Sequence, residues 1–369
     1  MIKTITNEYD FIDSVIVHRP DIEHLEMTPK NLNSEDDENY LLFDDIIDLR
    51  IAQKEHDLFT SVIKKFTGED KCFELLSMLK DVSGDFDLTS KHPLPNIMFT
   101  RDLGVSIGNS VIITWASNSV RNPENILAKQ IIKNHKVFSK SIIYDFHKNH
   151  PGLAFEGGDV TLINEEVVAI GISERTSIHS VEAIVPFMYE NGVKYIMCFN
   201  MPKERRFMHL DTVLSIINTN EAIAYPPFFQ KNNPLELDVN IIKTSENVPT
   251  SHMKLKANHA FDDVGIDMKF IKCGGDNGKM QEREQWTDGA NAFCLAPGVI
   301  VLYDRNLNTL KELEKHGYEI MSARKFLDLD NFESGQKTVI TIESGELSRG
   351  RGGPRCLTMP IGRKNDSKR

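Results

Sequence analysis

The chain has 369 residues, of which 54 are acidic and 43 are basic, and its formal net charge is −11. This length is sufficient for a large core, and the acidic balance argues against a general nucleic-acid or anionic-membrane binder. The five cysteines form no C-x-x-C pair, which argues against a disulfide framework or a zinc knuckle. Residues 1–8 contain no apolar signal segment, and no apolar run approaches the roughly 18 residues that span a membrane, so we expect a cytoplasmic protein.

The first hundred residues predict only a few regular elements. A strand is predicted over 14–18, where Arg19 and Pro20 stop it, and an acidic loop follows at 34–39. Apolar residues recur at helical spacing over about 44–65, which predicts a helix. Residues 70–92 are expected to form short, mixed elements.

From about residue 99 the chain repeats one unit: a polar cluster, a strand, a tight turn, a second strand and usually a helix. The predicted strands lie at 111–114, 160–163, 167–170, 212–217, 222–224, 292–296 and 299–303. One helix is expected to open with Asn122 as N-cap and Pro123 at its first position, and another to cover 177–190. The polar clusters are Phe99-Thr100-Arg101-Asp102, Glu156-Gly157-Gly158-Asp159, His209-Leu210-Asp211 and Asp288-Gly289-Ala290-Asn291.

Repeats of this kind stack or close into a ring, because a single unit cannot bury its own apolar face. A ring would bring the clusters at the strand starts to one place, whereas an ordinary α/β domain would leave them scattered. We expect the ring, with the segments 14–18 and 338–342 and the glycine-rich loop near the C-terminus completing the closing unit.

That loop, residues 345–356, contains four glycines, three arginines and Cys356 at its end. So many glycines indicate a backbone that passes very close to another group. A thiol beside fixed cations has its thiolate favoured, and the thiolate is the nucleophile. Taken alone, the loop also fits a flexible basic segment that ends in a structural cysteine.

In a ring, the clusters and the loop would gather a candidate site composed of Asp102, Glu156, Asp159, His209, Asp211 and Cys356. Four carboxylates repel one another unless a cation lies between them. A metal is one candidate, but no H-x-x-x-H or H-E-x-x-H pattern supports zinc. The other is a guanidinium, whose planar N–H groups pair with carboxylates and whose carbon a thiolate can attack while a histidine supplies a proton. Each cluster alone also fits a solvated turn, so the hypothesis depends on their shared position in the repeat.

The clusters and the loop resemble those of bacterial arginine deiminases over essentially the whole chain. The segments that carry the resemblance are Val17-His18-Arg19-Pro20, Leu41-Leu42-Phe43-Asp44-Asp45, Phe99-Thr100-Arg101-Asp102, Phe155-Glu156-Gly157-Gly158-Asp159, Met208-His209-Leu210-Asp211-Thr212-Val213, Glu282-Arg283-Glu284-Gln285-Trp286, Ala296-Pro297-Gly298-Val299 and Ser344–Cys356. This resemblance implies a single catalytic domain over 1–369, an α/β five-bladed pseudo-symmetric propeller of strand-turn-strand-helix repeats. It also implies a reduced, mainly helical insertion region at 36–92.

The resemblance implies hydrolysis of L-arginine to L-citrulline and ammonia through a covalent thiouronium, with no cofactor and no metal. Cys356 matches the nucleophile, His209 the general acid and base, and Asp102, Asp211 and Glu156 the carboxylates that hold the guanidinium. The residues that match the rest of the substrate site are Asn96, Phe99, Asp159, Gly350, Arg351 and the pair Arg121 and Arg175. The last two lie at equivalent places in successive repeats and are expected at the α-carboxylate.

Several alternatives stay open at this point. The reduced insertion leaves lid shape in doubt and a homo-oligomer possible, and Leu103 replaces the proline that the family commonly has after the first aspartate. The chain also fits an amidinotransferase, a deiminase of agmatine or a methylated arginine, an arginine dihydrolase, or a non-catalytic arginine-binding protein. We expect a small-molecule substrate as partner, with no nucleic acid and no membrane.

Overall fold

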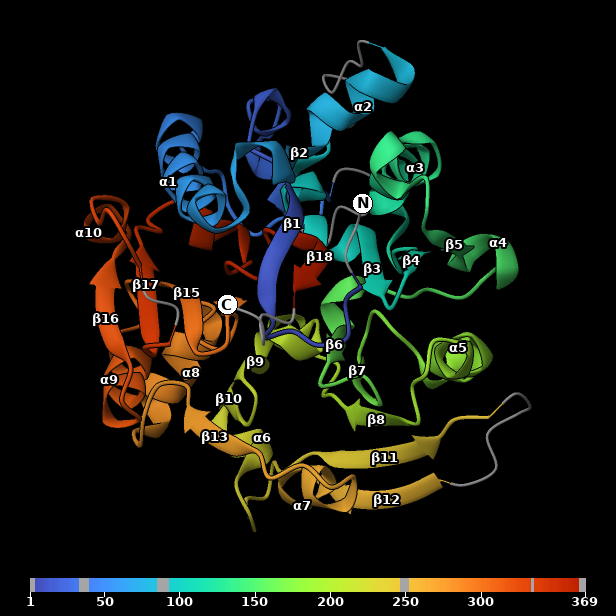
Figure 1. Ribbon diagram of the computed structural model, residues 1–369, viewed down its shortest axis with the longest axis vertical. Helices are drawn as coiled ribbons and strands as arrows, with labels where there is room; N and C mark the ends of the chain where they lie inside the picture. The colour runs from blue at the N-terminus through green and yellow to red at the C-terminus, as the bar shows by residue number, and fades with distance from the viewer. Residues whose placement is uncertain (1–3, 33–39, 85–92, 246–251, 333–334, 365–369) are drawn as a thin grey trace.

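The computed structural model describes residues 4–32, 40–84, 93–245, 252–332 and 335–364, which form a mixed α/β fold. The strands make five separate sheets, and Figure 1 shows these sheets distributed around the middle of the molecule. No helix in the described part is both long enough and apolar enough to cross a membrane.

Each sheet contains an antiparallel strand pair, one member of which also pairs in parallel with a third strand. One sheet consists of β3 (Gly104–Ile107), β4 (Ser110–Ile113) and β5 (Ile142–Asp145). A second consists of β6 (Val160–Leu162), β7 (Val167–Ile172) and β8 (Tyr195–Asn200), and is extended by β11 (Asp238–Lys243) and β12 (His252–Lys256). The others are β9 (Leu214–Asn218), β10 (Glu221–Ala224) and β13 (Lys269–Lys272); β14 (Phe293–Ala296), β15 (Val299–Tyr303), β16 (Glu319–Ser322) and β17 (Thr338–Ile342); and β1 (Phe11–Val17), β2 (Cys72–Glu74) and β18 (Met359–Lys364). One pairing pattern shared by all five sheets confirms the repeat that the sequence predicts.

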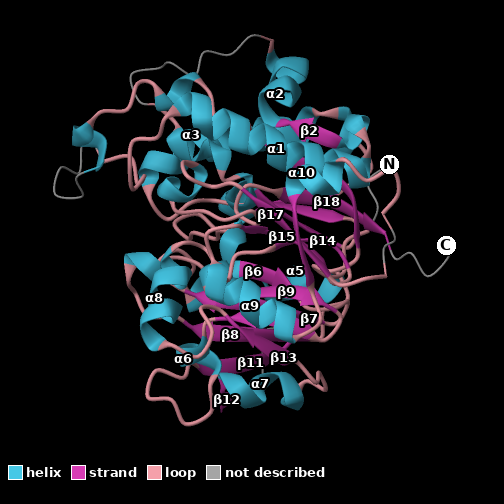
Figure 2. Cartoon of the chain, turned by 90° about the vertical axis from the view of Figure 1, so that its left-hand side faces the viewer, coloured by secondary structure: helices cyan, strands magenta, loops and turns pink. Residues whose placement is uncertain are grey.

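Helices connect the strands and lie mostly toward the periphery in Figure 1. They are α1 (Leu49–Thr67), α2 (Leu75–Ser83), α3 (Asn122–Asn134), α4 (Phe146–Asn149), α5 (Ile178–Glu190), α6 (Pro226–Phe229), α7 (Ala257–Asp263), α8 (Gly278–Trp286), α9 (Leu307–Lys315) and α10 (Ala323–Leu327). In Figure 2, α2 lies at one end of the molecule and β12 at the opposite end. The predicted start of α3 is one residue off, since Asn122 is already helical and Arg121 precedes it.

The longest helix, α1, shows how local sequence and packing act together. The side chain of Asp48 accepts hydrogen bonds from the amides of Arg50 and Ile51 and so caps the first turn. Its apolar face, which includes Phe59 and Val62, belongs to a buried cluster that also contains Phe99 and Cys356. The helix therefore packs in the same part of the core as Cys356, at the end of the glycine-rich loop.

A short polar segment precedes the first strand of the repeated hairpins, as the sequence predicts. Single-turn 3₁₀ helices at Thr100–Leu103, Gly157–Asp159 and Leu210–Thr212 stand directly before or close to β3, β6 and β9. Residues 288–291 precede β14, and Cys356 precedes β18 in the same manner. The clusters and the cysteine thus occupy equivalent places in the five sheets.

The prediction for the closing unit is only half correct. The predicted strand at 14–18 is confirmed as β1, but 338–342 forms β17, which pairs in parallel with β15 and β16 in another sheet. The antiparallel partner of β1 is instead β18, which begins three residues after Cys356. Pro360 and Gly362 hide this strand in the sequence, and the pairing is irregular around Gly362.

The described part of the region 36–92 contains α1, β2 and α2. Strand β2 pairs with β1, so this region contributes to a sheet as well as to helices. Residues 36–39 and 85–92, and with them the predicted acidic loop at 34–39, lie outside the described residues.

Candidate active site

The short segments at the strand starts carry four of the predicted catalytic residues. Asp102 and Asp211 lie within such turns, while Glu156 and His209 immediately precede them. All four side chains are buried. The repeat therefore brings together polar residues that are far apart in the chain.

Gly158 allows two of these turns to approach each other. A β-carbon at this position would lie 2.4 Å from His209 Nδ1 and 2.9 Å from Asp102 Oδ1, which is closer than real β-carbons come to other atoms. The Gly158 amide instead donates to Asp102 Oδ1 at 3.0 Å. The second glycine of the Glu-Gly-Gly-Asp cluster is thus required by close packing rather than by a turn conformation.

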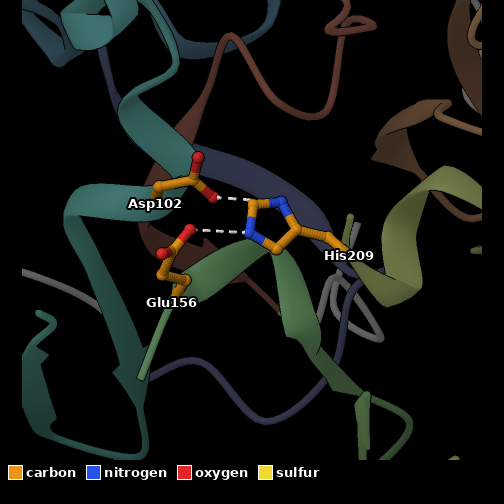
Figure 3. Close-up of side chains that lie close together, drawn as sticks. All are labelled: Asp102, Glu156 and His209. Carbon is orange, nitrogen blue, oxygen red and sulfur yellow. Dashed lines mark hydrogen bonds and ion pairs between the residues drawn. The ribbon is translucent and has the colours of Figure 1, made fainter. Parts of the chain in front are cut away.

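Glu156, His209 and Asp102 form a buried cluster in which both carboxylates face the imidazole (Figure 3). His209 Nε2 donates to Glu156 Oε2 at 2.8 Å, and His209 Nδ1 lies 3.7 Å from Asp102 Oδ1. The backbone amide of Ser117 donates to the other oxygen of Glu156 at 2.8 Å. The ring is therefore held between two carboxylates.

These carboxylates keep a proton on His209. Burial by itself lowers the pKa of His209, but the charges of Asp102 and Glu156 raise it to about 9. Burial would raise the pKa of Glu156, yet the hydrogen bond from His209 and the charges of Arg175 and Arg121 hold that pKa well below its usual value. At neutral pH the pair is an imidazolium and a carboxylate, so His209 carries the proton that a general acid donates.

The same three side chains also offer the donor atoms of a metal site. Among the described residues, one oxygen or nitrogen from each of Asp102, Glu156 and His209 lies within 4.8 Å of the others. However, Arg121 Nη1 donates to Asp102 Oδ2 at 2.6 Å and lies 3.9 Å from Glu156 Oε2. The carboxylates are thus already balanced by a guanidinium and an imidazolium, and this arrangement suits a metal ion less well than it suits organic cations.

Cys356 lies beside the second aspartate. Its thiol donates to Asp211 Oδ2 at 3.6 Å, and Arg355 Nη1 donates to the same oxygen at 2.8 Å. The other oxygen, Asp211 Oδ1, is buried and has no hydrogen-bond partner within the part of the chain that the structure describes. A buried carboxylate oxygen without a partner, next to a thiol, is suited to an N–H donor of a cationic ligand.

The expectation that neighbouring arginines favour the thiolate is wrong for the protein without substrate. Burial raises the pKa of Cys356 well above its usual value, and the charges of Asp211 and Asp102 raise it further. Of the loop arginines, Arg349 pairs with Asp45 and Arg351 stacks on Trp286. Arg355, paired with Glu8 and Asp211, lowers the thiol pKa, but by less than burial and the carboxylates raise it. The thiol is therefore protonated at neutral pH until another cation arrives.

A cavity with about 340 Å³ of empty volume is lined by Cys356 and His209. The other predicted residues in its lining are Asn96, Phe99, Asp102, Arg121, Arg175, Gly350 and Arg351. Glu156 and Asp211 are not in the lining, but they contact His209 and Cys356, which are.

Asp159 contacts the backbone of the site rather than the cavity. Its Oδ2 accepts a hydrogen bond from Ser173 Oγ at 2.7 Å, and its Oδ1 accepts one from the Leu210 amide at 3.1 Å. Burial raises its pKa to about 7. This geometry supports a positioning role next to His209 and does not support direct contact with a substrate.

Arg121 and Arg175, which occupy equivalent places in two successive repeats, differ in how many of their N–H groups are already hydrogen-bonded. Arg121 is committed through Nε to Glu124, through Nη1 to Asp102 and through Nη2 to the Asn96 carbonyl. Arg175 donates only from Nε, to Glu174 at 3.1 Å, among the described residues. The Nη donors of Arg175 are therefore the ones available to an anion in the cavity.

The glycine-rich loop forms one wall of the cavity. Arg351 has a left-handed backbone with φ of 64°, and its guanidinium carbon lies 3.6 Å from the centre of the Trp286 ring. Its Nε and Nη1 are buried without hydrogen-bond partners among the described residues. A β-carbon on Gly350 would lie 2.6 Å from the Phe43 ring, so only glycine fits there. Arg351 thus stands beside the cavity with donors to spare.

Sequence reasoning missed two polar residues of the site. Arg205 lines the cavity and donates to Asp44 and to the Leu42 carbonyl, but in the charged run Lys203–Arg206 it is typical of a solvated surface. Asn291 accepts a hydrogen bond from the Cys356 amide at 3.1 Å and donates to the Asp211 carbonyl at 3.0 Å. Its place in the fourth polar cluster was the signal that could have found it.

Comparison with known proteins agrees with this geometry. The family profile described as Arginine deiminase matches residues 78–363. The arginine deiminase of Listeria monocytogenes serovar 1/2a is 32% identical over 430 aligned positions, which cover 98% of this chain and 98% of that protein.

Two solved structures share the fold at 14% sequence identity. DDAH from Pseudomonas aeruginosa complexed with citrulline gives a TM-score of 0.57 and covers 95% of this chain and 99% of that chain. AgrE in a ternary complex with ornithine and NAD+ gives a TM-score of 0.60. The alignment covers 96% of this chain but only 40% of the AgrE chain. With the family profile, the near full-length relative and the shared fold together, the chain belongs to the arginine deiminase family.

Proposed function

We propose that this chain hydrolyses L-arginine to L-citrulline and ammonia through a covalent thiouronium intermediate on Cys356. The observation that carries the proposal is a thiol 3.6 Å from the Asp211 carboxylate, in a cavity that Asp102 and His209 also line. Family membership supports the same reaction.

The substrate guanidinium would lie between the two aspartates. Asp211 Oδ1 has no hydrogen-bond partner in the described chain, and a guanidinium offers planar N–H groups that match carboxylates. Glu156 would assist through His209, to which it is hydrogen-bonded. In this position the electrophilic carbon faces the Cys356 sulfur.

Substrate binding would also activate the nucleophile. Asp211 and Asp102 raise the pKa of the Cys356 thiol, so a guanidinium that neutralises them removes this effect and adds an attractive positive charge. The thiol loses its proton to solvent, a sulfur–carbon bond forms, and the guanidinium carbon becomes tetrahedral. His209 then gives its proton to one terminal nitrogen, the carbon–nitrogen bond breaks, and ammonia leaves.

Water completes the reaction at the same histidine. After its proton has gone to ammonia, the imidazole accepts a proton from a water molecule, whose oxygen attacks the thiouronium carbon. The carbon–sulfur bond breaks, the thiol regains a proton, and the ureido group of citrulline is left. Glu156 and Asp102 hold the ring in one orientation for both proton transfers.

The far end of the substrate would be recognised by cationic groups. We assign the α-carboxylate first to Arg175, whose Nη donors are uncommitted in the described chain, with Arg121 as its repeat-related partner. Arg351 and the Gly350 backbone would close over the substrate, and Asn96 and Phe99 would line its aliphatic and amino part.

The same proposal extends to the architecture and the compartment. The five sheets with one pairing pattern, together with the β1–β18 pair that joins the two ends of the chain, support a five-bladed propeller and one catalytic domain over 1–369. Cysteines that are all free support a reducing, cytoplasmic setting.

The test is product analysis with L-arginine and with agmatine, which lacks the carboxylate. L-Arginine is expected to give citrulline and ammonia in equal amounts, whereas two ammonia per arginine would indicate a dihydrolase. Losing a charged hydrogen bond costs about 1.5–3 kcal/mol, so kcat/KM for agmatine should be lower by well over ~10-fold.

Arg175→Ala should lower arginine turnover and leave agmatine little changed. Equal turnover of agmatine and arginine by the wild-type protein would overturn the assignment of L-arginine as substrate.

A further inference from the structure

A second cavity is also lined by residues of the polar turns, and it has no part in the proposed reaction. It has about 320 Å³ of empty volume, and its lining includes Glu8, Arg101, Ser106 and Arg363. Arg101 is adjacent in sequence to Asp102, which lines the first cavity. Neighbouring residues of one turn therefore line two different cavities.

Positive charge is in excess around the second cavity. Arg101, Arg355 and Arg363 are all buried, with exposed fractions of 6%, 2% and 2%. Arg355 is paired with both Asp211 and Glu8, while Arg101 has only Glu8, at 3.8 Å. Arg363 has no ion pair among the residues that the structure describes.

Two donors in this cavity are also left without hydrogen-bond partners. Arg363 donates from Nη1 to the Asp10 carbonyl, but its Nη2 is buried and unpartnered within the described chain. Ser106 Oγ, on β3, is buried and unpartnered in the same way. A guanidinium nitrogen and a hydroxyl that line one cavity are the kind of donors that an anion accepts.

Water alone would not balance this site. A water molecule satisfies hydrogen bonds, but a buried guanidinium without a counter-charge still carries a desolvation penalty. Burial and the neighbouring Arg355 accordingly lower the pKa of Arg101 to about 9, and burial also lowers that of Arg363. Among the charged residues that line the cavity, two guanidiniums, Arg101 and Arg363, face one carboxylate, Glu8, and the Asp10 carboxylate acts on Arg363 only from outside the lining. One negative charge would therefore complete the balance within the lining.

We propose that this cavity binds a small monovalent inorganic anion, with chloride as its chemical type, between Arg101, Arg363 and Ser106. The anion stabilises the folded state by neutralising the excess charge. It also stabilises the position of Arg355. The Arg355 guanidinium is paired with Glu8, which lines this cavity, and with Asp211, which lies beside Cys356. The site is separate from the substrate cavity, so it can be tested whatever reaction the protein catalyses.

The first test is the midpoint of thermal unfolding in sodium chloride and in sodium gluconate at one ionic strength. Gluconate carries its charge at the end of a long hydroxylated chain and serves as the weakly binding reference, so chloride should raise Tm relative to gluconate in a saturable manner. For a chain of this size the rise is about 1–2 °C at ten times the Kd.

Ser106→Ala should fold and require more chloride for the same rise, and Arg363→Gln should abolish the rise. Arg175→Ala, in the substrate cavity, is the matched control and should keep the chloride response. An equal Tm in both salts, or loss of the chloride response in the Arg175→Ala variant alone, would overturn the proposal.

The second test locates the anion directly. Crystals grown in sodium bromide should show an anomalous bromide peak next to Arg363 Nη2 and Ser106 Oγ, and the Ser106→Ala protein should show a weaker one. Anomalous maps without a peak in this cavity would overturn the proposal even if the Tm responds to chloride.

Discussion

Replacing Gly158 by alanine should disable the His209 general acid while leaving every catalytic side chain in the sequence. The new methyl group would lie 2.4 Å from His209 Nδ1, 2.7 Å from its Cγ and 2.9 Å from Asp102 Oδ1. Ordinary contacts need at least about 3.4 Å, so the ring must retreat by roughly 1 Å. That shift breaks the 2.8 Å hydrogen bond to Glu156. A misplacement of about 1 Å costs on the order of 100-fold in rate, or ~2.7 kcal/mol of barrier.

The assay for this prediction is citrulline formation from L-arginine, measured together with thermal unfolding. Overpacking costs about 1–3 kcal/mol of stability, which for a chain of this size lowers Tm by only about 1–4 °C. The control is Gly335→Ala, because a β-carbon at Gly335 has no atom of the described residues within 4 Å; it should keep full activity. A folded Gly158→Ala protein with kcat/KM within about 3-fold of the wild type would refute the tight coupling of this turn to His209.

Three further predictions follow from the same site. Because burial and carboxylates raise the pKa of the Cys356 thiol, its inactivation by iodoacetamide without substrate should be slow at pH 7 and keep rising through pH 9; a plateau below pH 8 would contradict the raised pKa. Exhaustive chelation should leave citrulline formation unchanged, and activity that is lost and then restored by a divalent metal would assign the Asp102, Glu156 and His209 donors to that metal. Single replacements of the other four cysteines should keep most activity, since none of them lines the cavity: Cys72, Cys198, Cys273 and Cys294.

The repeat was visible in the sequence because each unit carries its own polar cluster and turn signal. Chain order alone placed Asp102, His209 and Cys356 in equivalent positions, and the structure brings them to one cavity. The closing strand β18 was not predictable, because its pairing with β1 joins the two ends of the chain and Pro360 and Gly362 obscure its period.

Charge states at the site could not be read from residue types. The three arginines of the glycine-rich loop led to the prediction of a thiolate, but Arg349 pairs with Asp45 and Arg351 stacks on Trp286. Arg355 does lie beside the thiol, yet it is paired with Glu8 and Asp211, and its effect on the thiol pKa is smaller than that of burial and the carboxylates. Burial and the nearer carboxylates decide the pKa of the thiol, and both are properties of the folded chain. Likewise, the repeat relates Arg121 to Arg175, but only the folded structure reveals that Asp102 and Glu124 already engage Arg121.

The most direct test of the proposed reaction is mass spectrometry of the protein quenched with acid during turnover of L-arginine. Peptide mapping should find a substrate-derived thiouronium on the peptide that contains Cys356, and the Cys356→Ser protein should neither form this adduct nor produce citrulline. An adduct on the peptide of any other cysteine, or citrulline formation by the Cys356→Ser protein, would contradict covalent catalysis by Cys356.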